Sequence, residues 1–132
     1  MYIEQALLTE LGNAAALVAL VGTRIYYVRA PQDVTKPYII LTKISSVRNH
    51  AHDGSSHLAV SRFQLSIFAT TYKETKDIAA QVQAALQAKS GNIGDSPYVE
   101  TGSILYEDET DMFESDTGLY HCAVDYMVTH YD

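Results

Sequence analysis

Three of the five histidines in this 132-residue chain stand close together, beside an aspartate. They are His50, His52 and His57, and Asp53 lies among them. Because side chains alternate along an extended segment, His50 and His52 would share one side, and zinc or nickel accepts such imidazole ligands. The stretch also carries an Asp-Gly pair and two serines, which are typical of a hairpin tip. With no rigid partner for a metal in view, we interpret Arg48 and these four residues as a polar loop, solvated or in contact with another subunit.

An acidic run nearer the C-terminus is the second candidate. Within ten residues it holds six acids and no base: Glu107, Asp108, Glu109, Asp111, Glu114 and Asp116. A calcium loop of the EF-hand type needs a glycine at its turn and a fixed spacing of ligands, and the run has neither. We therefore predict no metal here, but a negative turn or lid that is solvated or forms part of an interface.

Nucleophilic catalysis has little support in the sequence. Cys122 is the only cysteine, and it falls on the apolar face of an expected strand, where a cysteine behaves as a small buried hydrophobe. His121 and Asp125 share the opposite face, for which a cross-strand salt link is the ordinary explanation. Gly-x-Ser-x-Gly, His-Glu-x-x-His and phosphate-loop motifs are absent from the sequence. The expectation is a protein that is not an enzyme and holds no cofactor.

Charge and length narrow the class of protein further. The net charge is −7, and about −1 would remain without the acidic run. No basic stripe is present to neutralise phosphates, which argues against nucleic-acid binding by charge attraction. The apolar residues 14–21 are too few to cross a bilayer, which takes about 20. We expect one soluble, cytoplasmic domain over residues 1–132, without a membrane partner.

The fold class follows from residues 62–86, where the apolar period changes from two to about 3.6. Phe63, Leu65 and Ile67 alternate with polar residues, as in a strand with one buried face. Thr71 and Glu74 then form a capping box at the start of an amphipathic helix. A strand that leads directly into such a helix predicts an α+β fold: a mostly antiparallel β-sheet of four to five strands with helices packed on one face.

The other elements have weaker but readable signals. Helices are predicted over residues 2–11, 14–21 and 72–89, and strands over residues 25–28, 38–45, 58–68, 103–107 and 119–130. The second and third strands form a long hairpin with its tip at residues 49–56, and residues 90–102 form an exposed connection. A five-stranded sheet leaves at least one unpaired edge. With its protruding hairpins, it suits a subunit that builds a closed ring by head-to-tail contacts.

Several short motifs, spread in order along nearly the whole chain, resemble the tail completion (tail-to-head joining, or tail terminator) family of long-tailed bacteriophages and prophages. They are Gly22-Thr23-Arg24-Ile25-Tyr26, Ala30-Pro31-Gln32, Pro37-Tyr38-Ile39, His52-Asp53-Gly54, residues 64–69 followed by Thr71-Tyr72, and Asp108-Glu109 followed by Thr117-Gly118-Leu119-Tyr120. One departure is His121-Cys122, where members frequently have a basic residue after the tyrosine. That departure removes an arginine contact expected at this point.

The resemblance implies a structural virion protein without enzymatic activity. Copies would form a homo-oligomeric ring, six-fold by this resemblance, that caps the tail tube, ends tail assembly and docks to the head connector and neck proteins. DNA would only pass through the ring, past the acidic run. The chain would sit at the tail–head junction of a virion assembled in the bacterial host cytoplasm. Two alternatives stay open: another head–tail connector or tail tube subunit, and a small metal-binding protein that uses the histidine loop at residues 50–57.

Overall fold

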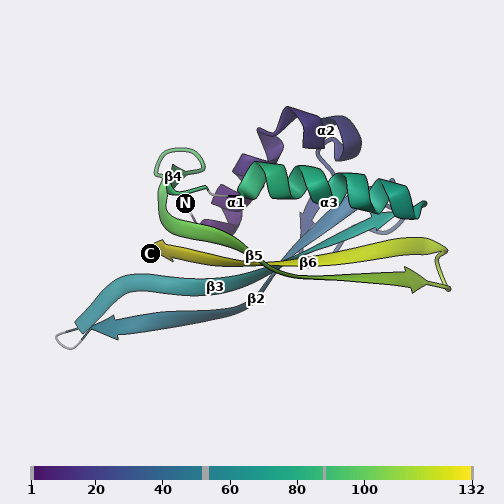
Figure 1. Cartoon of the computed structure of the whole chain (residues 1–132). Coiled ribbons are helices and arrows are strands. Elements are labelled where there is room, and N and C mark those ends of the chain that lie inside the picture. Colours follow the sequence, from purple (N-terminus) through teal and green to yellow (C-terminus); the bar gives the residue numbers. More distant parts are fainter. Residues whose placement is uncertain (1, 52–53, 88, 132) are drawn as a thin grey trace.

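The computed structural model describes residues 2–51, 54–87 and 89–131, which form one sheet with three helices on it (Figure 1). The helices are α1 (Ile3–Gly12), α2 (Ala15–Val21) and α3 (Tyr72–Leu86). The strands are β1 (Ile25–Tyr27), β2 (Tyr38–Ala51), β3 (Gly54–Ala69), β4 (Gly91–Ile93), β5 (Val99–Glu114) and β6 (Leu119–Tyr131). This arrangement confirms the mixed α+β class.

The sheet has six strands in the order β1-β2-β3-β6-β5-β4, so the expected number of four to five is wrong. In the described sheet, β1 and β2 pair in parallel and the other neighbours are antiparallel. The additional strand, β4, lies within residues 90–102, which were expected to be an exposed connection. A three-residue strand that begins with glycine is too short to show a period-two pattern. Its Ile93 nevertheless joins the core.

The acidic run is the second correction, because its residues up to Glu114 form part of a strand and only Asp116 lies in a turn. β5 continues without a break to Glu114, and its acidic half pairs with the first half of β6. Acids are unfavourable in strands, so propensity alone ends the strand near residue 107. The strongly alternating β6 supplies a full ladder of backbone partners, and that pairing overrides the propensity.

Two long hairpins point toward opposite ends of the molecule, and the β2–β3 hairpin extends far beyond the helices (Figure 1). β2 and β3 are both longer than predicted and remain paired as far as Ala51 and Gly54. β5 and β6 form the other long hairpin, with Glu114 paired to Leu119 at its end. α3 covers the β5–β6 hairpin almost to its end, where Tyr72 bonds to Asp111, so the β2–β3 hairpin is the one that projects far from the helices (Figure 1).

The main core lies between the helices and one face of the sheet. Thr71 Oγ1 accepts a hydrogen bond from the Glu74 backbone N–H at 3.2 Å, which confirms that half of the predicted capping box. From α3, Ile78, Val82 and Leu86 enter the core, as their helical spacing predicts. Burying each side chain contributes roughly 1.5–3 kcal/mol before entropy is subtracted.

The opposite face of the sheet, which we call the helix-free face, has a smaller apolar cluster of its own. Tyr38, Phe68 and Leu119 are buried there, and Ala30 and Val34 from the β1–β2 connection pack against them. The connection thus covers one part of this face, and the helices lie on the other side of the sheet (Figure 1).

In the described part of the chain, no single helix is long and apolar enough to be a candidate membrane span. α1 and α2 pass such a test only as a pair, with a bend of 88° between them. Both helices bury apolar side chains in the core, among them Leu7, Leu11 and Leu17.

Candidate functional site

In the described residues, the end of the β2–β3 hairpin pairs with no other strand of the sheet. The last pair between β3 and β6 joins Leu58 to Tyr131, and beyond it β2 and β3 pair only with each other in the described residues. We call residues 49–57 the arm. An isolated two-stranded hairpin is marginally stable in water, so such an arm gains stability from a partner surface.

Three of the five predicted interface residues lie at the root and on the strands of this arm. Arg48 is exposed at the root and lines a groove of about 830 Å³ with Lys43, Tyr2 and Tyr98. His50 and His57 belong to the two strands of the arm, whereas His52 and Asp53 lie outside the described residues. Two hypotheses from the sequence remain predictions: that these residues contact a partner, and that the histidines bind a metal.

The six acids of the acidic run do not gather at one point. Glu109 and Asp111 lie on the helix-covered side of β5, where both bond to Lys76 of α3. Asp108 is paired with Asp125 across the β5–β6 ladder. Glu107 falls at a bulge between Tyr106 and Asp108, and Asp116 lies in the turn after β5.

Glu114, near the C-terminal end of the acidic run, lies on the helix-free face. A carboxylate oxygen of Glu114 lies 3.7 Å from Nδ1 of His121, and the His121 ring stacks on Phe68. Burial lowers the pKa of His121, while Glu114 acts in the opposite direction. Because the acids are divided between two faces of a strand, they cannot converge on one calcium ion.

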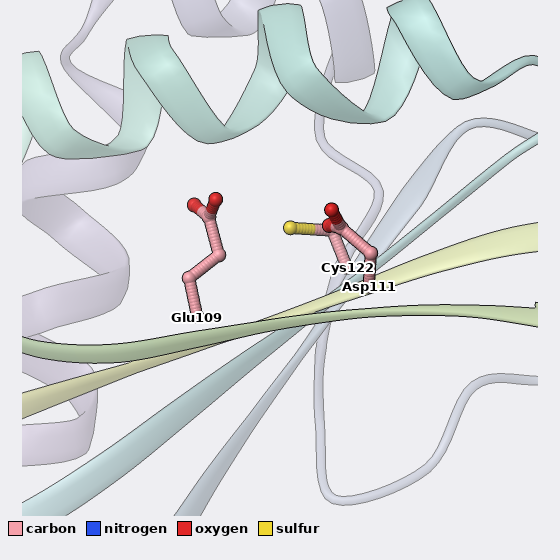
Figure 2. A group of neighbouring side chains, drawn as sticks. All are labelled: Glu109, Asp111 and Cys122. Carbon is pink, nitrogen blue, oxygen red and sulfur yellow. The ribbon is translucent and has the colours of Figure 1, made fainter.

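Glu109, Asp111 and Cys122 form a compact group beneath α3 (Figure 2). Their ligand atoms lie within 4.8 Å of one another, a spacing that would suit a metal ion. The Lys76 ammonium is, however, 2.8 Å from Glu109 Oε2 and 2.7 Å from Asp111 Oδ1. Tyr72 also donates its hydroxyl to Asp111 at 2.9 Å.

The chemistry of this group does not fit a metal site. Burial raises the pKa of Cys122 to about 12, so the thiol stays protonated at neutral pH, whereas metals bind the thiolate. The Lys76 ammonium already supplies the positive charge that the two carboxylates need. The group therefore acts as an ion-pair cluster that fastens α3 to β5.

Replacing Lys76 with methionine should lower the free energy of unfolding by about 1 kcal/mol at neutral pH, since partly exposed ion pairs contribute little. The hydrogen bond from Lys76 holds the pKa of Asp111 below its ordinary value of 3.8. A lowered folded-state pKa stabilises the fold above the unfolded pKa, and this contribution is lost as the pH falls through the folded pKa. The difference in the free energy of unfolding between the wild type and the variant should therefore shrink as the pH falls through the folded-state pKa of Asp111. Urea unfolding at pH 7 and at about pH 3 measures it; an undiminished difference at the lower pH would contradict the assignment.

The sequence analysis did not identify two residues that form ion pairs between elements, Arg62 and Lys76. Arg62 on β3 holds Asp125 on β6 with contacts of 2.7 and 3.1 Å, which confirms the expected cross-strand salt link and supplies its partner. The ion pairs of Lys76 could not be predicted because its carboxylate partners lie 33 and 35 residues away in the chain. Only the alternation of Arg62 with the apolar residues of β3 placed it on the polar face.

Comparison with known proteins decides the family. A family model described as Tail completion protein gp17 matches residues 5–131. The chain belongs to the tail completion protein family. The resemblance seen in the short motifs is thereby confirmed, and family membership makes the chain a structural protein of a phage tail.

The fold has a counterpart among solved structures, while no curated protein matches the sequence. A chain of the structure titled "Virion of native gene transfer agent (GTA) particle" superimposes with a TM-score of 0.82 at 18% identity. The match covers 98% of this chain and 95% of the other. At that identity the likeness shows that the tail completion fold is shared, from α1 to the end of β6.

Proposed function

We propose that copies of this chain assemble into a closed ring, a hexamer, that caps the finished tail tube, stops further tube growth and presents the surface to which the head connector docks. The observation that carries this proposal is the pair of hairpins that point to opposite ends of one small core, of which the β2–β3 hairpin extends beyond the helices (Figure 1). They provide two different contact surfaces on one subunit. Unlike surfaces make head-to-tail contacts, and such contacts close into rings when the rotation permits.

The arm is the element we assign to contact with a neighbouring subunit or the tail tube. In the described residues its two strands pair only with each other. We assign the polar residues Arg48, His50, His52, Asp53 and His57 to this contact. A partner would supply the support that a lone hairpin lacks. No catalytic role is proposed for any of these residues.

The helix-free face is the one we assign to the lumen of the ring. Asp108 and Glu114 bring negative charge to it, and DNA phosphates passing nearby would be repelled instead of held. Glu109 and Asp111 take no part in this role because they face α3. DNA is thus a passenger in the proposed ring, and no phosphate-binding surface is required.

Neutralising Asp108 and Glu114 together, as Asp108→Asn/Glu114→Gln, should leave the fold intact and alter assembly or genome release. Both side chains are exposed or half-exposed, so their effect on the free energy of unfolding should stay within about 0.5 kcal/mol. The yield of infectious or DNA-transferring particles measures the effect, with circular dichroism as the check on folding. An unchanged yield would count against the lumen assignment.

Electron microscopy of particles made without this chain tests the proposed role. Loss of a capping ring should give overlong tails, or tails that remain separate from heads. Loss of a tail tube subunit, the main alternative, should give no tails at all. Restoring the wild-type chain should return tails of uniform length joined to heads at the virion's tail–head junction, after assembly in the host cytoplasm.

A further inference from the structure

Two long strands, β2 and β5, have an outer neighbour along only part of their length in the described residues. β1 covers β2 only as far as Leu41, where Val28 donates its N–H to the Leu41 carbonyl at 3.0 Å. β4 covers β5 only as far as Thr101. We call the remaining lengths the β2 edge (residues 42–51) and the β5 edge (residues 102–114). Unpaired edges of this length are sites at which another strand adds.

The side chains on these two edges complement each other. The β2 edge carries Lys43 and Arg48 and no acid, whereas the β5 edge carries five acids and no base. Both edges also expose apolar side chains to solvent, with Ile44 and Val47 on the first and Leu105, Met112 and Phe113 on the second. Val47 is 68% exposed and Leu105 is 58% exposed. Exposed apolar surface of this kind is unfavourable in a monomer but suits a contact surface.

We propose that the β2 edge of one copy pairs antiparallel with the β5 edge of the next, so that the sheet continues from subunit to subunit around the ring. This inference rests on the proposed ring and names the surfaces that build it. The strands β2, β3, β6 and β5 alternate in direction, so adding a second β2 beside β5 keeps the alternation. Two β5 edges would instead bring acids against acids, which disfavours a two-fold dimer through that edge.

The ladder within one subunit also suggests the register between subunits. Thr42 and Asp108 lie at one level of the sheet, linked through Gln64 and Asp125. Asp108 is the midpoint of its edge, whereas the midpoint of the β2 edge lies between residues 46 and 47. Aligning the two midpoints requires a stagger of about 15 Å between neighbouring copies. Closed sheets require a stagger of this kind.

The staggered register brings opposite charges together. It places Arg48 of one copy beside Glu107 of the next. Lys43 and Asp111 also come side by side, although each already has an ion-pair partner in its own chain, Glu4 and Lys76. Without the stagger, Arg48 would lie opposite Gly102, where no charge is available. Bulges after Lys43 and after Tyr106 bend both edges, as is common at the rims of barrels where a sheet must curve.

Hydrogen exchange of the backbone amides tests the pairing without assuming a register. Exchange should be compared between the dilute monomer and the ring, formed by the purified chain or on isolated tails. Amides of both edges should exchange at least about tenfold more slowly in the ring, because each added strand bond must open before exchange occurs. The amides of α3 provide an internal reference that should change little.

Charge reversal tests the register itself. Arg48→Glu alone, and Glu107→Lys/Asp108→Lys alone, should each weaken ring formation about tenfold or more, as like charges then face each other. Combining both sets in one chain should restore it. Lys73→Glu, on an exposed turn of α3, matches the first charge change, and Asp95→Lys/Glu100→Lys, away from the β5 edge, matches the second. Native mass spectrometry over a range of concentrations gives the fraction in rings.

Each outcome separates the edge pairing from the ring. Slow exchange at both edges together with rescue by the combined variant supports the pairing. Rings whose edges exchange as fast as in the monomer, or in which one edge is protected only when the tube protein is present, would overturn it and leave the capping ring standing. A wild-type chain that forms no ring at any concentration and none on tails would instead overturn the proposed function.

Discussion

Replacing residues 49–56 with an Asn-Gly turn should abolish tail capping and leave the monomer folded. In the described residues, the strands of the arm pair only with each other beyond Leu58, so shortening them breaks no pairing with the rest of the sheet. Asn-Gly followed by His57 and Leu58 makes a four-residue loop between Arg48 and Ala59, so the native register of the remaining pairs is kept. The free energy of unfolding should therefore change by no more than about 1 kcal/mol. Circular dichroism and urea unfolding check the fold, and electron microscopy of tails checks capping.

A variant of equal length separates the reach of the arm from its side chains. In this control, the polar residues His50, His52, Asp53 and His57 are replaced with serine, so the backbone length is retained. If the side chains make the contact, this control should also lose capping; if the strands alone make it, capping should persist. A shortened arm that still caps tails would contradict the assignment of the arm to a partner.

Val82→Asp should unfold the whole domain. Val82 is fully buried and belongs to the apolar core between α3 and the sheet. Burying an unpaired charge and losing the apolar contacts should cost more than about 4 kcal/mol, against a total stability of about 5–15 kcal/mol for such a domain. Far-ultraviolet circular dichroism and thermal unfolding measure the loss.

The matched control for Val82→Asp is Ala84→Asp on the solvent side of the same helix. Ala84 is exposed, so its replacement should reduce stability by no more than about 0.5–1 kcal/mol through helix propensity. A folded, cooperatively melting Val82→Asp variant would show that α3 does not hold the core together in the way described above.

The strand-to-helix junction could be predicted from the sequence because local signals agree there. Phe63, Leu65 and Ile67 follow a period of two, and the helix from Thr71 onward follows a period near 3.6 with a capping residue at its start. The same agreement located α1, α2 and β6. Where propensity, periodicity and turn chemistry point the same way, tertiary structure has little left to decide.

The acidic half of β5 and the short β4 could not be predicted in this way. β5 continues through its acids because β6 offers a complete ladder, and because Lys76 balances the two acids that face α3. These are contacts between residues far apart in the chain, which no local window contains. The Arg62–Asp125 pair has the same origin.

The central claim is that the chain acts as a closed ring at one end of the tail tube. End-on and side views of tails carrying the wild-type chain, averaged by electron cryomicroscopy, test it most directly. We predict one closed ring of six copies at the head-proximal end of every finished tube. Copies spread along the tube, located at its far end, or bound singly without a closed ring would contradict it.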